Sequence, residues 1–466
     1  MASFVERMMG GARLDVRTFE EVEADPAALQ PAMVDEVGDR LLRRNPMTFL
    51  GNDKANANRR SIRRAGTLSR REFTGQAAWG LAFASGLPAL AQVRDRSPLR
   101  IARIDPYVLR IGSRSNHVCA RVETEDGLHG WGEGTTPPSH PAVVAQIREC
   151  GKLIVGESAW DIEKLWRRMY IAEENTLGGT LFAAMSAIEI ALWDIVAKKL
   201  NVPVYSLLGG KFSDTLRVYA SYRWGDIPRT REAYAQRTKE LIQEGATAGK
   251  FDPFGAYPGP DRQLSTTVLN EVREMIRGIR EGGPNFDILI EAHGKFNAAS
   301  AGRIAKMLEP FDPFFLEEPV PPENVDAMAA VQRSTNIPIA TGEGLQSHFN
   351  YYSVLKQEAA RILQPDVARV GGISAMKKIA AMADAHYVTI APHNPNGPVC
   401  TAASIHVAAS IPNFLIMEEG NRDTTDYNDL FAGGWRHSIT EWPVLETPGL
   451  GIDLPPEFLK ERTVTV

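Results

Sequence analysis

Six acidic or basic side chains recur at nearly constant intervals through the second half of the chain. Each ends a short apolar run, and they are Glu291, Glu317, Glu343, Asp366, His393 and Glu418. The intervals are roughly 25 residues, the length of one strand, one helix and two loops. If the runs are parallel strands of a (β/α) barrel, these side chains meet at the carboxyl ends of the strands, where such barrels carry their active sites.

The first three of these positions are all glutamates. Glu291, Glu317 and Glu343 offer only oxygen ligands, and hard oxygen donors without thiolate or imidazole suit Mg²⁺. Carboxylates brought close together repel one another unless a cation neutralises them. The pattern therefore predicts a magnesium site, with the neighbouring Glu318 directed elsewhere because side chains alternate along a strand.

His393 and Asp366 end neighbouring predicted strands. An aspartate that holds one ring nitrogen fixes the tautomer of the imidazole and raises its basicity, so we expect His393 to be a general base supported by Asp366. His293 lies two residues beyond Glu291, which directs it toward the metal site, where it would protonate a leaving group. Substrate binding or loop packing is the alternative role for His293.

Lys250 and Asp252 end the second predicted strand and share a face by the same alternation. Two roles are open for Lys250. It either pairs with a metal-site carboxylate or contacts a substrate carboxylate. A purely structural ion pair is the alternative to both roles. Lys250 and Asp252 complete the candidate site residues that the predicted fold has to bring together.

Eight apolar runs separated by helical stretches must position this set, and they predict a parallel sheet buried on both faces and closed as a barrel. The runs are residues 217–222, 248–250, 287–291, 314–317, 337–340, 361–363, 388–391 and 414–417. Before them, residues 99–133 alternate as short strands and residues 141–200 read as helices, which predicts a compact α+β region.

The composition is that of an ordinary globular protein. The chain has 466 residues, 44% of them hydrophobic and 23% charged, with a formal net charge of −5. A mildly acidic protein with scattered basic residues has no general electrostatic reason to bind nucleic acid. The cysteines, Cys119, Cys150 and Cys400, are odd in number and far apart, which predicts buried apolar residues rather than disulfides or a zinc site.

A twin-arginine pair, Arg70-Arg71, precedes an uncharged run that ends in Ala89-Leu90-Ala91. This is the order of an export signal with a small-residue cleavage site, so we expect a periplasmic protein, with a cytoplasmic one as the alternative. Gly80, Gly86 and Pro88 make the run a poor permanent membrane span. An ordinary amphipathic helix is the competing interpretation, and Met47 is an alternative start.

The motifs together resemble the enolase superfamily, in its mandelate racemase/muconate lactonizing subgroup and near the galactonate dehydratase-like sugar acid dehydratases. The resemblance runs from about Leu99 to the C-terminus. It is carried by residues 187–194 (AIEIALWD) and 203–210 (PVYSLLGG) and by the barrel motifs EAH at 291–293, FLEEP at 315–319, GE at 342–343, QPD at 364–366, PH at 392–393 and Glu418.

The resemblance implies a (β/α)7β barrel, TIM-like, with an α+β capping domain. The expected organisation is residues 1–91 as an extension with the twin-arginine signal, 92–215 as the capping domain, 216–425 as the barrel and 426–466 as a segment that returns to the capping domain. It also implies a homo-oligomer and a hydrogen bond between Glu418 and an enediolate. Two positions depart from the family pattern: Glu291 replaces the more common Asp, and Asp252 replaces the second lysine of Lys-x-Lys in racemases.

The reaction expected from this resemblance is a dehydration. A sugar acid would lose its α-proton to His393 and its 3-hydroxyl with a proton from His293, giving a 2-keto-3-deoxy acid. The alternatives are a cycloisomerase that opens an anhydro-sugar acid or a sugar lactone, an epimerase using Lys250 and His393, and a metal-binding barrel without turnover. Side chains near Tyr222, Arg223 and Trp224 are expected to select the substrate.

Overall fold

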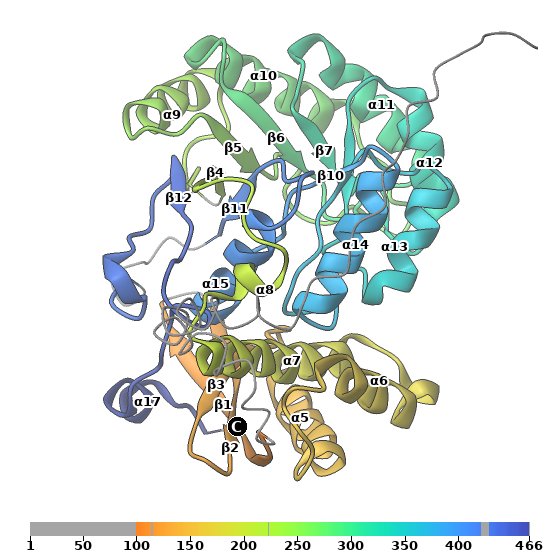
Figure 1. The fold of residues 1–466 in the computed structure, drawn as a ribbon. Coiled ribbons are helices and arrows are strands. Elements are labelled where there is room, and N and C mark those ends of the chain that lie inside the picture. The colour runs from red at the N-terminus through yellow and green to blue at the C-terminus, as the bar shows by residue number, and fades with distance from the viewer. Residues whose placement is uncertain (1–98, 113–114, 222, 421–427, 466) are drawn as a thin grey trace, which may run out of the picture. The chain divides into compact units, whose positions relative to one another are not determined.

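The computed structural model describes residues 99–465 apart from 113–114, 222 and 421–427 (Figure 1). The twin-arginine segment and Tyr222 lie outside the described residues, so export and a role for Tyr222 stay predictions. One described helix, α7 (Gly179–Leu200), is long and apolar enough to cross a membrane, but 89% of its apolar window is buried inside the protein. Burial of this kind is typical of a core helix.

A three-stranded antiparallel sheet with helices packed on it opens the described chain. The strands follow the order β1-β2-β3. The elements of this part are β1 (Ile101–Ile111), β2 (Ser115–Thr124), β3 (His129–Glu133), α5 (His140–Ile154), α6 (Ile162–Ala172), η3 (Glu174–Thr176), α7 and α8 (Val204–Leu207). The α+β region expected from the sequence is therefore present, and two of the cysteines, Cys119 and Cys150, are buried in it without a disulfide.

Glycines at every second position let β3 lie directly on the backbone of α7. Gly130, Gly132 and Gly134 share the face that contacts the helix. A Cβ built on them would lie 2.2, 1.8 and 2.0 Å from the carbonyl oxygens of Ala191, Ala187 and Ala183, respectively. Because a carbon atom cannot approach an oxygen so closely, only glycine fits at these three positions.

Eight parallel strands form the barrel. Their order is β10-β9-β8-β7-β6-β5-β4-β11, and a parallel bridge between Ile390 and Phe414 joins the last strand segment to β10 and closes the ring. The strands are β4 (Thr215–Ser221), β5 (Ala248–Phe251), β6 (Asp287–Glu291), β7 (Phe315–Glu317), β8 (Ile339–Thr341), β9 (Ile362–Leu363), β10 (Thr389–Ile390) and β11 (Met417–Glu419). The predicted TIM-like barrel with a capping region is confirmed.

Helices surround the barrel, and one apolar side chain from each strand or its flank fills the interior. The helices are α9 (Arg231–Gln243), α10 (Thr266–Gly282), α11 (Ala298–Leu308), η4 (Glu309–Phe311), α12 (Val325–Ser334), α13 (Ser347–Lys356), α14 (Ile373–Ala385) and α15 (Pro398–Ala409). The interior residues are Tyr219, Ala248, Leu289, Phe315, Ala340, Ile362, Ala391 and Ile416. This apolar plug leaves polar groups room only at the ends of the barrel.

The C-terminal segment contacts both parts of the protein. It contains η5 (Ala432–Gly434), β12 (Glu441–Pro443) and α17 (Pro456–Arg462). Strand β12 pairs antiparallel with the beginning of β4, and the Val464 amide donates to the Val108 carbonyl in β1. The segment therefore links the first barrel strand to the first sheet.

Buried carboxylates of the capping region accept hydrogen bonds at the start of two barrel helices. Glu189 of α7 accepts the amide protons of Ile373 and Ser374, at 2.7 and 2.8 Å, where α14 begins. Glu133 accepts those of Gly397 and Cys400, at 2.7 and 2.9 Å, where α15 begins. A carboxylate at a helix N-terminus satisfies otherwise unpaired amides and interacts favourably with the helix dipole.

Glu189→Ala is expected to destabilise the fold by about 3 kcal/mol or more, because it leaves the buried amides of Ile373 and Ser374 without their side-chain acceptor and removes one of two acceptors of the Trp193 indole. The matched control is Glu163→Ala, which breaks an exposed ion pair between α6 and Lys378 of α14 and is expected to cost less than about 1 kcal/mol. Urea unfolding of both variants measures the difference. Equal losses would show that Glu189 does not act as a buried cap.

Candidate active site

Three glutamates converge at the carboxyl ends of consecutive strands. Glu291 ends β6, Glu317 ends β7, and Glu343 lies two residues beyond β8. One carboxylate oxygen from each lies within 4.8 Å of the others, and the first two side chains are buried. This all-oxygen set fits a hard divalent cation, and the longer Glu291 still reaches the group.

Lys250 extends from β5 into the same cluster. Its ammonium nitrogen lies 2.9 and 3.0 Å from the oxygens of Glu317, 3.4 Å from Glu291 and 3.2 Å from Glu418. Burial alone would lower the pKa of Lys250, but the carboxylates of Glu317 and Glu418 outweigh it and hold this pKa above its usual range. Lys250 is thus paired with Glu317 and Glu291, two of the carboxylates predicted to hold a metal.

His393 and Asp366 form a buried hydrogen-bonded pair beside the cluster. Nδ1 of His393 lies 2.9 Å from Asp366, and Nε2 lies 3.0 Å from Glu343. Burial works against protonation of His393, yet the charge of Glu343 and the bond to Asp366 raise its pKa to about 10. The Asn396 amide holds both oxygens of Asp366, at 2.9 and 2.8 Å.

The sequence predictions assigned no role to Asn396. Its position three residues after His393, in the loop between β10 and α15, was the only signal available. Gln364 was predicted only as part of the QPD motif, with no role of its own. In the structure its amide nitrogen donates to Glu317 at 2.6 Å. Both residues orient groups of the cluster rather than forming it.

Glu418 lies on β11, whose neighbours in the ring are β4 and β10. It accepts hydrogen bonds from the Ser221 hydroxyl and the Asn394 amide, both at 2.9 Å. Burial raises its pKa, but the charges of Lys250 and His393 and these hydrogen bonds outweigh it and lower the pKa. Glu418 is therefore an ionised carboxylate beside Lys250.

His293 lies at the edge of the cluster, but a strand does not place it there. Strand β6 ends at Glu291, and His293 has a φ of +49°, in the left-handed region. Its amide donates to Glu291 at 2.6 Å, and its ring Nδ1 lies 2.8 Å from Asp252. The turn, not strand alternation, brings this imidazole to the site.

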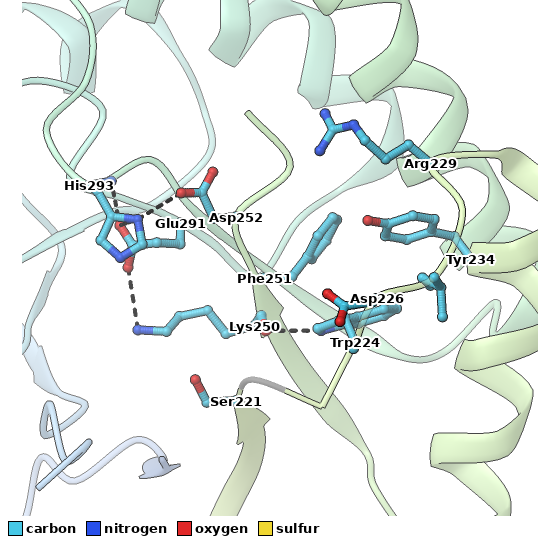
Figure 2. A pocket seen from close by; sticks show the side chains of 12 residues that line it. Ser221, Trp224, Asp226, Arg229, Tyr234, Lys250, Phe251, Asp252, Glu291 and His293 are labelled. Atoms are coloured by element: carbon cyan, nitrogen blue, oxygen red, sulfur yellow. Dashed lines mark hydrogen bonds and ion pairs between the residues drawn. The ribbon is translucent and has the colours of Figure 1, made fainter. Parts of the chain in front are cut away.

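A cavity of about 350 Å³ opens from the cluster over β4, β5 and β6 (Figure 2). This volume is at the lower end of the range typical of small-molecule pockets. Its lining residues are Ser221, Trp224, Gly225, Asp226, Ile227, Arg229, Tyr234, Lys250, Phe251, Asp252, Glu291 and His293. The sequence predictions missed Asp226 and Arg229, because a charged loop residue carries no periodic signal.

The chain matches two family models. One, described as Enolase C-terminal domain-like, covers residues 233–458, and the other, the Mandelate racemase / muconate lactonizing enzyme N-terminal domain, covers residues 92–209. Among solved structures, a mandelate racemase/muconate lactonizing enzyme-like protein from Roseovarius sp. TM1035 superimposes with a TM-score of 0.74 at 35% identity. That match covers 79% of this chain and 96% of the other.

Curated relatives align over most of their own lengths. D-xylonate dehydratase of Haloferax volcanii is 34% identical, over 74% of this chain and 85% of the relative. D-galactonate dehydratase of Xanthomonas euvesicatoria is 35% identical, over 73% of this chain and 89% of the relative. These names describe carbon–oxygen lyases, which confirms the enzyme class expected from the sequence. With both family models matched and such relatives aligned, the chain belongs to the mandelate racemase/muconate lactonizing enzyme family of the enolase superfamily.

Proposed function

We propose that the protein is a Mg²⁺-dependent dehydratase of an aldonate-type sugar acid that yields a 2-keto-3-deoxy acid. The observation that supports it most is the placement of two histidines around one carboxylate cluster, in a chain whose curated relatives are named dehydratases. His393 follows β10 and His293 follows β6, and three strands lie between β6 and β10 in either direction around the ring. The two imidazoles therefore belong to opposite sides of the barrel.

Glu291, Glu317 and Glu343 would hold the cation. When bound, Mg²⁺ supplies Lewis acidity, which draws electron density from the substrate carboxylate and makes the proton on C2 more acidic. Lys250 presents a fixed positive charge beside the same position, where negative charge develops as that proton leaves. Burial of Lys250 and Glu317 keeps these charges in a region of low dielectric constant, which strengthens their effect.

His393 is placed to take the C2 proton. Its Nε2 faces the cluster, while Asp366 holds Nδ1 and so fixes the ring and its tautomer. A cation held by Glu343 would offset the negative charge that raises the pKa of His393, and would so favour the neutral imidazole that a base requires. His293, across the barrel, is placed to give a proton to the 3-hydroxyl as it leaves. Removal of a proton on one side and of hydroxide on the other is an elimination, and the enol that results tautomerises to the 2-keto acid.

A racemase needs a base on each face of C2. Lys250 is the only amine contributed by β5, and three carboxylates contact it. Asp252, which stands where racemases have a second lysine, accepts hydrogen bonds from the loop that carries His293. An ammonium that donates to three carboxylates has no lone pair with which to accept the C2 proton. This arrangement favours elimination over epimerisation.

A screen of aldonic acids in D₂O with Mg²⁺, followed by proton NMR and a keto-acid assay, tests the proposal. We expect a 2-keto-3-deoxy acid from at least one acid, loss of activity after EDTA treatment, and recovery when Mg²⁺ is added back. Deuterium incorporation at C2 without a new product would indicate an epimerase instead. Reaction of anhydro-sugar acids or lactones alone would indicate a cycloisomerase.

A further inference from the structure

Asp252 joins the loop after β5 to the loop after β6. Its Oδ2 lies 2.8 Å from Nδ1 of His293 and also accepts a hydrogen bond from the ammonium of Lys295, while Oδ1 accepts the Phe254 amide at 2.9 Å. Lys295 is buried and donates in addition to the Gly255 carbonyl at 2.7 Å. The carboxylate of Asp252 is thus fixed by contacts on both oxygens.

The backbone of His293 is held as firmly as its ring. The His293 amide donates to Glu291 at 2.6 Å, and the Tyr257 hydroxyl donates to the His293 carbonyl at 2.9 Å. Nδ1 contacts Asp252, and within the described part of the chain Nε2 has no hydrogen-bond partner. The side chain is 35% exposed. It lines the cavity, as Figure 2 shows. Only Nε2 is therefore free to meet a ligand.

We propose that Asp252 is the positioning residue of His293, an inference that rests on the dehydratase function proposed above. Asp252 keeps a proton on Nδ1, so that the proton that is transferred sits on Nε2 and faces the cavity. The site then contains two histidine–aspartate pairs, His393–Asp366 and His293–Asp252, four strands apart. One pair orients the base, and the other orients the acid.

Following the protons through the reaction shows which step depends on Asp252. Nε2 of His393 accepts the C2 proton, and the electron pair of that C–H bond forms the C1–C2 double bond of an enediolate. That pair then shifts to form the C2–C3 double bond as the C3–O bond breaks. The leaving oxygen takes the Nε2 proton of His293 and departs as water. His393 later releases a proton to solvent, and His293 regains one. Asp252 acts only on the step in which the C3–O bond breaks.

Asp252→Asn tests this role, with Asp261→Asn, in an exposed part of the same loop, as the matched control. For the acid found in the screen, we expect kcat of dehydration to fall by about 10²-fold with KM changed less than about threefold. Exchange of the C2 proton with D₂O should continue at the wild-type rate, because His393 and Asp366 are untouched. Asp252→Glu should recover part of the dehydration rate.

The 3-deoxy-3-fluoro analogue of that sugar acid distinguishes the role of His293 as the proton donor from the roles of the other site residues. Fluoride leaves as an anion and needs no proton, so Asp252→Asn and His293→Asn should eliminate fluoride at near wild-type rates. Equal losses of exchange, dehydration and fluoride release in Asp252→Asn would overturn the proposal. So would a fall in fluoride release as large as the fall in dehydration.

A spectroscopic measurement stands apart from turnover. In protein with ¹⁵N-labelled histidine, the Nδ1 proton signal of His293 is assigned by its loss in His293→Asn. This signal should lie downfield in the wild type and move upfield in Asp252→Asn, because a carboxylate is a stronger acceptor than an amide. An unchanged signal would overturn the pairing even if the protein dehydrates a sugar acid. If no acid reacts but the signal moves, the dehydratase function fails and the pairing stands.

Discussion

His393→Asn is expected to lower turnover by about 10³-fold or more, while Mg²⁺ affinity stays within about tenfold of the wild type. Asparagine cannot take a proton at neutral pH, and no other imidazole of the described residues contacts both Asp366 and Glu343. Loss of Nε2 also removes a partner of Glu343, which explains why some change in metal affinity is expected. Initial rates of keto-acid formation and calorimetric titration with Mg²⁺ measure the two effects.

Proton exchange at C2 distinguishes this variant from Asp252→Asn. Removal of the base should stop exchange and dehydration together, whereas loss of support for the acid should stop dehydration alone. His386→Asn, at the exposed end of α14, is the matched control and should behave as the wild type. If His393→Asn still exchanges the C2 proton at the wild-type rate, another group is the base.

Glu317→Gln is expected to weaken Mg²⁺ binding by at least about 10²-fold and to reduce turnover in proportion at limiting metal. Glu317 is fully buried, and its oxygens serve Lys250, Gln364 and the predicted metal position at once. The amide keeps the shape of the side chain but removes one negative charge and one acceptor. Calorimetric titration gives the affinity, and the rise in melting temperature caused by Mg²⁺ should largely disappear.

Glu323→Gln is the matched control for this change, because Glu323 is exposed in the loop that follows the same strand. It should bind Mg²⁺ and turn over as the wild type does. Wild-type Mg²⁺ affinity in Glu317→Gln would contradict a metal site at the cluster. An equal loss in both variants would point to general electrostatics rather than to direct ligation.

The positions of the site residues along the chain could be predicted because barrel geometry is periodic. Runs of apolar residues that end in Glu291, Glu317 and Glu343 mark three strand ends, and each observed strand stops at that residue or within two of it. The parallel register then brings the ends together whatever the intervening sequence is. The spacing along the sequence was enough to predict this cluster, because residues at equivalent strand ends of a barrel lie close together in space.

The contacts beyond the strand ends could not be predicted in the same way. Alternation placed Lys250 and Asp252 on one face, and both do line the cavity, but Asp252 lies past the end of β5 and contacts a different loop. His293 depends on a left-handed turn that a histidine rarely adopts. These outcomes are set by contacts between separate loops, for which a single sequence carries no spacing signal.

The carboxylates that join the two regions were missed for the same reason. Glu133 and Glu189 read as ordinary acidic residues at the end of a strand and within a helix, yet both are fully buried at the starts of distant helices. Glu133 contacts the beginning of α15, directly after the loop that carries His393 and Asn396. Sequence separations of more than 180 residues hide such pairs.

The face of β3 that lies on α7 has a consequence for how this enzyme can change over evolutionary time. Gly130, Gly132 and Gly134 leave no side chain there to alter, and each neighbouring alanine carbonyl forbids a new one. Drift at these positions is therefore blocked, whereas the loop that carries Trp224 and Arg229 borders open space. New substrate preferences should arise by replacement in such loops, while this strand and helix are inherited unchanged.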